Sequence, residues 1–254
     1  MSIVQIIGAG NMPARLAALF WVGLERGASI IVAADPPSSG KTTTLSALLA
    51  FTPPDTLVYF TRGQGETFSL PVLSTSFPTY LLINEMSDHI PVYTWDDHAR
   101  RAFQLLSEGY SLASTMHADS VQGVLSQLEG DLQIPRSQIA NLTFIVPMYI
   151  GRGEGTVRRV TEVAFLQPDG ATGVAMGTIA AWDRDADAFD IFPEPAQRDV
   201  FARWAKLTPG QLAAELDRRE GFLETLRQTN VESVREVSLA IEGFYDQVIK
   251  ATQP

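Results

Sequence analysis

The sequence contains no cysteine and no long apolar run. The absence of cysteine excludes disulfide bonds and thiolate metal sites and fits a reducing compartment, so we expect a cytoplasmic protein. No window reaches the ~18 apolar residues of a membrane span, and the N-terminus lacks the basic and apolar regions of a signal peptide. We therefore predict no transmembrane segment, and we expect any membrane contact to be peripheral, at the inner face of the cell membrane.

Clusters of positive charge are also missing. The chain has 19 Lys and Arg against 29 Asp and Glu, a formal net charge of −10, and no run of basic residues would form a local stripe. Because such a chain repels phosphate backbones, we expect no nucleic-acid partner. What is present is a globular composition: 254 residues, 45% hydrophobic and 19% charged, enough for a large α/β domain with or without an appendage.

Helices and strands alternate over the first 140 residues. Short apolar runs bounded by turn residues predict buried strands, and the segments between several of them carry apolar residues at helical spacing. The predicted strands are 29–34, 56–60, 80–84 and 112–116. Strands separated by helices predict a doubly wound, mostly parallel α/β sheet.

Beyond residue 140 the pattern changes to consecutive strands, which predicts antiparallel additions to the sheet. The segments are 142–150, 158–166, 174–182 and 188–192. From Thr208 the pattern is helical again, and Thr208 with Gln211, and Ser233 with Glu236, have capping-box spacing. We predict an α/β domain over residues 1–200 and a helical C-terminal subdomain over 201–254.

The N-terminal segment IVQIIGAGNMPARL resembles a dinucleotide-binding fingerprint, because Gly8 and Gly10 follow a short apolar run. The third glycine is replaced by Pro13, however, and the run is too short for a strong signal. The alternative is a turn followed by a helix with Asn11 as its N-cap, and we favour it.

The segment ADPPSSGKTTTL carries the end of a phosphate-binding loop, Gly40-Lys41-Thr42. Backbone amides converge on phosphate at such a loop, so we expect ATP or ADP with Mg²⁺ to bind there. The expected binding residues are Pro37, Ser38, Ser39, Gly40, Lys41, Thr42 and Thr43. Lys41 would reach the β- and γ-phosphates, and Thr42 would ligate Mg²⁺. Asp35 occupies the position of the first glycine, where we expect positive φ, some strain, and a loss of affinity of up to roughly 1 kcal/mol.

Two further side chains follow predicted parallel strands. Glu85 ends one strand and His117 follows another, so both are expected at the carboxyl edge of the sheet, beside the loop. Glu85 would touch the Mg²⁺ shell or polarise the attacking water. His89 and His98 are expected on the surface, without a catalytic role.

Together, SSGKTTTLSALLAF, INEMSD and STMHADSVQGVLSQL resemble the Walker A, Walker B and histidine boxes of the type II/type IV secretion ATPases. The later strands and C-terminal helices resemble the archaeal-type branch, which includes archaellum and Tad pilus motors. This resemblance implies a RecA-like ATPase domain, assembly into hexameric rings, and a contact with a membrane platform protein. It assigns Lys41 and Thr42 to phosphate and Mg²⁺, Glu85 to the metal shell or lytic water, and His117 to sensing the γ-phosphate.

The chain also departs from the family pattern. The acidic box after the strand at 56–60 is replaced by TRGQGE, in which Glu66 is the first acid and the remaining candidate for activating water. Losing a positioned general base costs ~10²- to 10⁴-fold in rate. Asn84 and Ser87 replace a glycine and an arginine of the family, and the resemblance does not include the family's N-terminal domain.

Two hypotheses remain open. The first is a P-loop protein of the secretion ATPase superfamily that binds MgATP and hydrolyses it slowly. The second is a non-catalytic paralogue that regulates an active secretion ATPase or docks onto it.

Overall fold

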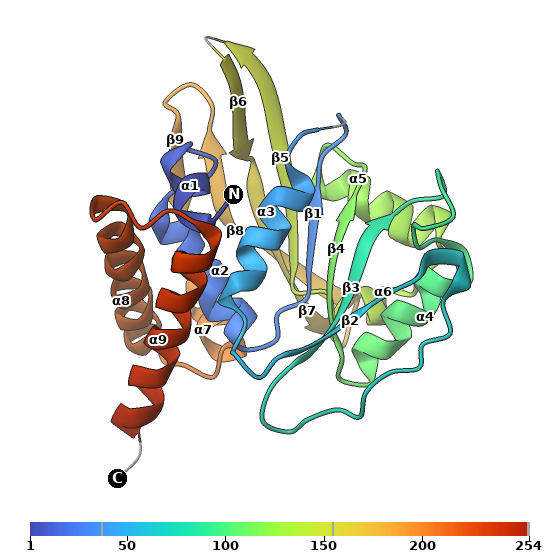
Figure 1. Ribbon diagram of the computed structural model, residues 1–254. Helices are drawn as coiled ribbons and strands as arrows, with labels where there is room; N and C mark the ends of the chain where they lie inside the picture. The colour runs from blue at the N-terminus through green and yellow to red at the C-terminus, as the bar shows by residue number, and fades with distance from the viewer. Residues whose placement is uncertain (37, 154, 253–254) are drawn as a thin grey trace.

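The computed structural model describes residues 1–36, 38–153 and 155–252. In this part of the chain a single sheet runs through the molecule, with helices on both faces (Figure 1). The strands are β1 (Ile30–Ala33), β2 (Leu57–Phe60), β3 (Thr79–Met86), β4 (Ser111–Met116), β5 (Phe144–Gly153), β6 (Gly155–Val160), β7 (Glu162–Asp169), β8 (Gly173–Asp183) and β9 (Ala188–Ile191). The helices are α1 (Ile3–Gly8), α2 (Ala14–Glu25), α3 (Lys41–Leu48), α4 (Asp96–Ser107), α5 (Val121–Ser126), α6 (Arg136–Ile139), α7 (Pro195–Trp204), α8 (Pro209–Gln228) and α9 (Val234–Thr252), with short helical turns η1 (Leu49–Phe51), η2 (Gly63–Gly65) and η3 (Gln127–Asp131).

The strand order is β2-β3-β4-β1-β5-β7-β8-β9, with β6 paired to β5. The first five strands in this order are parallel, and β6 to β9 are added antiparallel. The fold class expected from the sequence is therefore confirmed, including the mostly parallel sheet, the antiparallel additions and the C-terminal helices. Strand β4 lies between β1 and β3, so the strand before the predicted phosphate-binding loop and the strand that carries Glu85 are not direct neighbours.

Each face of the sheet packs on its own hydrophobic core. One core joins the sheet to α1, α2 and α3 and, further out, to α7, α8 and α9. The other joins the opposite face to α4, α5 and α6. Near the centre of the first core, buried Trp21 of α2 stacks on Phe51 with ring centroids 4.8 Å apart and donates a hydrogen bond to the Tyr245 hydroxyl of α9 at 2.9 Å. The C-terminal helices therefore share the core of the α/β sheet.

A buried arginine also links the C-terminal helices to α2. Arg219 of α8 is 1% exposed and pairs with Glu25 of α2 and with Glu215 of its own helix. Its guanidinium also lies 5.5 Å from the ring centroid of Trp21. Helix α7 runs across residue 200, and the division into domains 1–200 and 201–254 stays a prediction.

The structure changes the interpretation of the N-terminus. Residues Ile3–Gly8 form helix α1, which Ser2 and Gln5 close with a complete capping box. A dinucleotide fingerprint requires a strand before Gly8, so that alternative is wrong. The favoured alternative also needs correction, because the N-cap of α2 is Pro13 and not Asn11.

The later elements agree better with the sequence. The capping box of Thr208 and Gln211 is present, and Ser233 Oγ accepts a hydrogen bond from the Glu236 amide at 3.2 Å. The expected strand 158–166, however, is two strands, because Thr161 separates β6 from β7.

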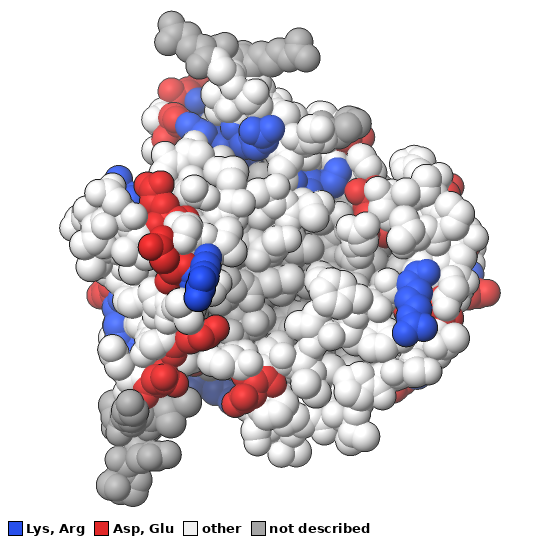
Figure 2. All heavy atoms as spheres, in the orientation of Figure 1, with Lys and Arg blue, Asp and Glu red and all other residues white. Residues whose placement is uncertain are grey.

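The visible charge is unevenly distributed. On the face in Figure 2, acidic side chains gather on the left, over α8 and α9, whereas the centre of this face is nearly free of charge. Among the helices of the described ranges, none combines the length and apolar character needed to cross a membrane.

Candidate functional site

Three parallel strands bring the predicted site residues to one edge of the sheet. The register pairs Ala33 at the end of β1 with Met116 at the end of β4, and Met116 with Met86 at the end of β3. The loop after β1, Glu85 near the end of β3 and His117 just after β4 therefore meet at the carboxyl edge, where open α/β sheets bind ligands.

The loop before α3 owes its shape to two residues with positive φ. Gly40 is the N-cap of α3 with φ 96°, and Ser38 has φ 60°. Asp35 does not have positive φ, so the expectation of strain at Asp35 is wrong. The glycine at position 40 is required, because a side chain there would be strained and its Cβ would lie 3.1 Å from the Arg158 side chain.

Lys41, the first residue of α3, is 6% exposed and folds back along the loop. Its Nζ donates a hydrogen bond to the Ala34 carbonyl at 3.0 Å and lies 3.5 Å from His117 Nδ1. Burial lowers the pKa of Lys41, and the negative charges of Glu85 and Asp35 act in the opposite direction. The ammonium is thus held at the mouth of the loop by the Ala34 carbonyl, beside the His117 ring.

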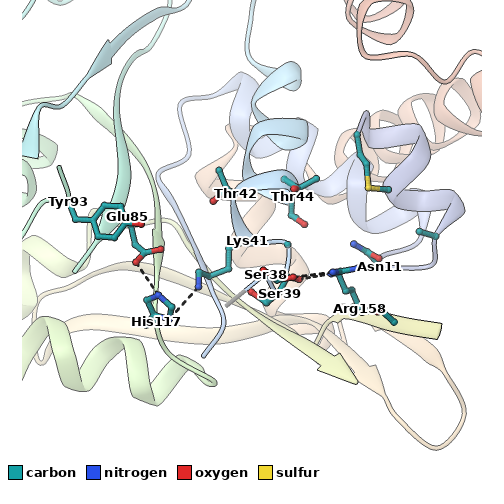
Figure 3. A pocket seen from close by; sticks show the side chains of 15 residues that line it. Asn11, Ser38, Ser39, Lys41, Thr42, Thr44, Glu85, Tyr93, His117 and Arg158 are labelled. Carbon is teal, nitrogen blue, oxygen red and sulfur yellow. Dashed lines mark hydrogen bonds and ion pairs between the residues drawn. The ribbon is translucent and has the colours of Figure 1, made fainter. Parts of the chain in front are cut away.

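Glu85 and His117 form a contact across the ends of β3 and β4 (Figure 3). His117 Nε2 lies 3.1 Å from Glu85 Oε1, and His117 Nδ1 lies 3.0 Å from the carbonyl oxygen of Asp35. The imidazole therefore connects the phosphate loop with the strand that carries Glu85.

An arginine from outside the parallel sheet closes the loop on the other side. Arg158 of β6 donates hydrogen bonds from Nη2 to the Ser38 carbonyl and from Nε to the Ser39 carbonyl, both at 3.0 Å. Figure 3 shows these bonds beside the loop, opposite Glu85 and His117. A second positive charge therefore stands at the loop in a chain that is acidic overall.

These residues surround one cavity of about 580 Å³. Its lining comprises Met1, Ala9, Asn11, Ser38, Ser39, Gly40, Lys41, Thr42, Thr43, Thr44, Glu85, Tyr93, His117, Thr156 and Arg158. The structure thus brings together eight of the residues expected in the site, Ser38 to Thr43, Glu85 and His117. Pro37 lies outside the described residues.

Glu66 does not belong to this group. Its carboxylate accepts hydrogen bonds from the Tyr59 hydroxyl and the Arg62 amide, each at 2.8 Å, and from the Phe68 amide. Burial raises the pKa of Glu66, but these hydrogen bonds outweigh burial and hold the pKa below its usual value. Because its oxygens close the turn around η2, the geometry does not support Glu66 as the group that activates water.

The lining fits a polyphosphate. The amides of Lys41, Thr42 and Thr43 open α3 and have no partner within the helix, while Gly40 has no side chain to cap them. Ser39 Oγ is buried without a hydrogen-bond partner, and Thr42 is exposed at the cavity. Amides at a helix N-terminus and two basic side chains suit phosphate, whereas the hydroxyl oxygens are the type of ligand that Mg²⁺ takes.

Arg158, Tyr93 and Asn11 line the cavity but were missed by reasoning from the sequence. Arg158 is 119 residues from Ser39, and its contact depends on how β6 folds back on β5. The basic pair Arg158-Arg159 in a predicted strand was the available signal, and nothing local connects it to the loop.

Comparison with known proteins gives distant relatives. No protein-family model matches the chain. Uncharacterized protein MJ0900 of Methanocaldococcus jannaschii is 26% identical over 282 residues, covering 97% of this chain and 49% of the relative. Uncharacterized protein MJ1287 of the same organism is 23% identical over 256 residues, covering 89% of this chain and 91% of the relative. The chain therefore spans about half the length of MJ0900 and most of MJ1287.

Two solved structures are also similar. The VirB11 ATPase of the Brucella suis type IV secretion system, in complex with sulphate, gives a TM-score of 0.43 at 18% identity, covering 63% of this chain and 58% of VirB11. The Legionella pneumophila ATPase DotB gives 0.38 at 11% identity, covering 93% of this chain and 65% of DotB. TM-scores this low do not establish a common fold, so the fold assignment rests on the strand order and the loop geometry.

Proposed function

We propose that this chain is a cytoplasmic P-loop ATPase-like protein that binds MgATP or MgADP and hydrolyses ATP slowly. The observation that supports it most strongly is that Lys41, Glu85 and His117 face one cavity together with the loop residues Ser38–Thr43. Lys41 neutralises phosphate charge, and the amides at the start of α3 hold phosphate oxygens. Thr42 and Glu85 would hold Mg²⁺, which supplies charge neutralisation when bound.

We expect slow hydrolysis because few acidic side chains line the cavity. Among the described residues that line the cavity, Glu85 is the one carboxylate. If Glu85 serves the metal, these described lining residues supply no second carboxylate to activate water, and a missing general base costs ~10²- to 10⁴-fold in rate. The contacts of His117 with Glu85 and with the loop support a role for His117 in sensing the phosphate.

Calorimetric titration with MgATP and steady-state phosphate release test this proposal. We expect Lys41→Ala to weaken ATP binding about tenfold or more, and Glu85→Gln to keep binding but lower turnover at least about tenfold. Lys206→Ala, at an exposed position of the same residue type, is the control and should behave like the wild type. Absence of binding heat in the wild type, or equal rates in all the variants, would refute the proposal.

The position of Glu66 favours a second candidate, a non-catalytic paralogue that regulates an active secretion ATPase. Its carboxylate closes a turn outside the cavity, so Glu85 is the one acid that the described part of the chain brings to the cavity lining. Tight MgATP binding without phosphate release above background would favour this candidate.

We further propose that the chain works in an assembly, as a homo-oligomer such as a hexamer or in a complex with an active secretion ATPase, at a membrane platform protein in secretion or pilus assembly. Light scattering after size exclusion, with and without MgATP, tests self-assembly. A strictly monomeric mass under both conditions would leave only the hetero-assembly.

A further inference from the structure

We propose that Glu85, His89 and His117 bind a first-row divalent transition metal, best fitted by Zn²⁺. One ligand atom from each side chain lies within 4.8 Å of the other two. Two imidazoles and one carboxylate are a ligand set for Zn²⁺ and its neighbours, with open positions for water, whereas Mg²⁺ prefers oxygen ligands. The proposed site therefore shares Glu85 with the proposed Mg²⁺ site but takes its other two ligands from imidazoles, which Mg²⁺ does not prefer.

The contact between His117 and Glu85 supports the metal site. His117 Nδ1 lies 3.0 Å from the Asp35 carbonyl, which can only accept, and 3.5 Å from the Lys41 ammonium, which can only donate. We assign the ring proton to Nδ1 because the contact with the carbonyl is the shorter one. In the neutral ring, Nε2 then directs a lone pair toward Glu85 Oε1 at 3.1 Å. Glu85 is 9% exposed, and its Oε1 is buried and receives no hydrogen bond of normal geometry. Two acceptors this close require a positive charge between them, which a proton or a metal ion supplies.

The Asp35 carbonyl also supports the proposed metal site, because it accepts a hydrogen bond from the His117 ring. Ligating histidines usually donate their second ring N–H to a carbonyl or carboxylate, which fixes the tautomer and the orientation of the ring. His117 has this arrangement in the structure, because Nδ1 contacts the Asp35 carbonyl while Nε2 faces Glu85. The ring is therefore oriented for binding before a metal arrives.

The loop between β3 and α4 brings the third ligand. Its ends are joined by the bridge of Met86 with Thr94 and by a hydrogen bond from the Thr94 amide to the Glu85 carbonyl at 3.0 Å. The loop places the His89 ring 5.6 Å from the His117 ring, at an interplanar angle of 80°. His89 Nδ1 is hydrogen-bonded with Ser87 Oγ, so donation from Nδ1 leaves Nε2 as the ligand atom. The expectation that His89 is exposed is correct, but His89 is not remote from the site.

The surroundings allow a cation and water to enter. His89 and His117 also line a second hollow of about 360 Å³, together with Asp88 and Asp131, whose negative charges favour a cation. The positive charge of Lys41 opposes metal binding, because Lys41 Nζ lies 3.5 Å from His117 Nδ1. We therefore expect the metal to bind more tightly when Lys41 is replaced by alanine.

Metal binding is measured on the nucleotide-free chain, with Zn²⁺ by calorimetry and with Co²⁺ by its visible absorption. We expect one ion per chain in the wild type and in His98→Gln, and binding weakened about tenfold or more in His89→Gln and Glu85→Gln. His98→Gln is the matched control, because it changes a histidine outside the cluster. Circular dichroism and thermal unfolding in a chelator confirm that the variants fold.

The proposal is overturned if wild type shows no saturable binding, if His89→Gln binds like wild type, or if His98→Gln loses as much affinity as His89→Gln. None of these outcomes depends on nucleotide, so they are distinct from failure of the proposed ATPase function. One consequence rests on that function: a metal at Glu85 and His117 inhibits ATP turnover, and His89→Gln reduces this inhibition.

Discussion

Arg158 Nε donates a hydrogen bond to the carbonyl oxygen of Ser39 at 3.0 Å, across 119 residues of sequence. The contact holds the phosphate loop from the side opposite Lys41 and places a guanidinium at the rim of the cavity. The site is therefore built by two parts of the sheet, the parallel strands and the antiparallel β5–β6 hairpin.

Replacing Arg158 by alanine is expected to weaken MgATP binding about tenfold, because hydrogen bonds from charged groups contribute ~1.5–3 kcal/mol and a positive charge leaves the cavity. Calorimetry measures the change. Arg198→Ala, at an exposed arginine that pairs with its neighbour Asp199, is the control. Unchanged affinity in Arg158→Ala would show that the hairpin is not part of the nucleotide site.

Replacing Glu66 by glutamine is expected to lower the free energy of unfolding by about 1–2 kcal/mol and to leave phosphate release unchanged. The carboxylate accepts hydrogen bonds within its own turn and is not among the cavity residues. Urea unfolding and a phosphate assay measure the two effects. If turnover falls while stability is retained, Glu66 activates water after all.

Tyr80→Phe is expected to cost about 1–3 kcal/mol of stability, because the buried Tyr80 hydroxyl donates to the Ala28 carbonyl at 2.9 Å, and that carbonyl would lose its partner. Urea unfolding checks this cost. Tyr149→Phe, whose hydroxyl is partly exposed and accepts from Arg184, is the control and should change stability by less than about 0.5 kcal/mol.

The same tyrosine gives a prediction about pH. Burial, and then the nearby Tyr245, raise the pKa of Tyr80 far above its usual value of about 10. Since the pKa is raised on folding, its contribution to stability is complete below pH about 10 and is lost as pH rises toward the pKa of the folded state. Ultraviolet titration of phenolate near pH about 11 should give the same amplitude for native wild type and Tyr80→Phe. A smaller amplitude in the variant would contradict the prediction.

Arg219→Ala is expected to cost about 3–5 kcal/mol, because it leaves Glu25 and Glu215 without their buried partner. Chemical denaturation measures the loss. Arg227→Ala, which removes a surface pair with Glu224, is the control and should cost less than about 1 kcal/mol. Equal effects would mean that burial of Arg219 does not determine its contribution.

The sequence was most informative where structure is local. Apolar runs and capping residues predicted the parallel strands and the cap of Thr208 with Gln211, because these depend on residues a few positions apart. The same logic failed at α1, where a short apolar run is compatible with a strand or a helix and the Ser2–Gln5 capping box decides for the helix.

The site was predictable only in part, for a related reason. Glu85 lies near the end of a strand, and Lys41, Thr42 and His117 follow the ends of two others, so a parallel sheet brings all four to one edge. Arg158 and His89 reach the same place through a hairpin and a loop whose paths are set by tertiary contacts. The spacing of residues in the sequence does not predict the paths of this hairpin and this loop.

The position of β4 between β1 and β3 has a mechanical consequence. Backbone hydrogen bonds on both sides of β4 fix the ends of these three strands against one another, so the phosphate loop, Glu85 and His117 keep their spacing as one block. The β5–β6 hairpin is joined to that block by the pairing of β5 with β1 and by the hydrogen bonds from Arg158 to the loop. We expect motion at this site to occur chiefly at Arg158, whose side chain can release the loop while the ends of the three strands keep their spacing.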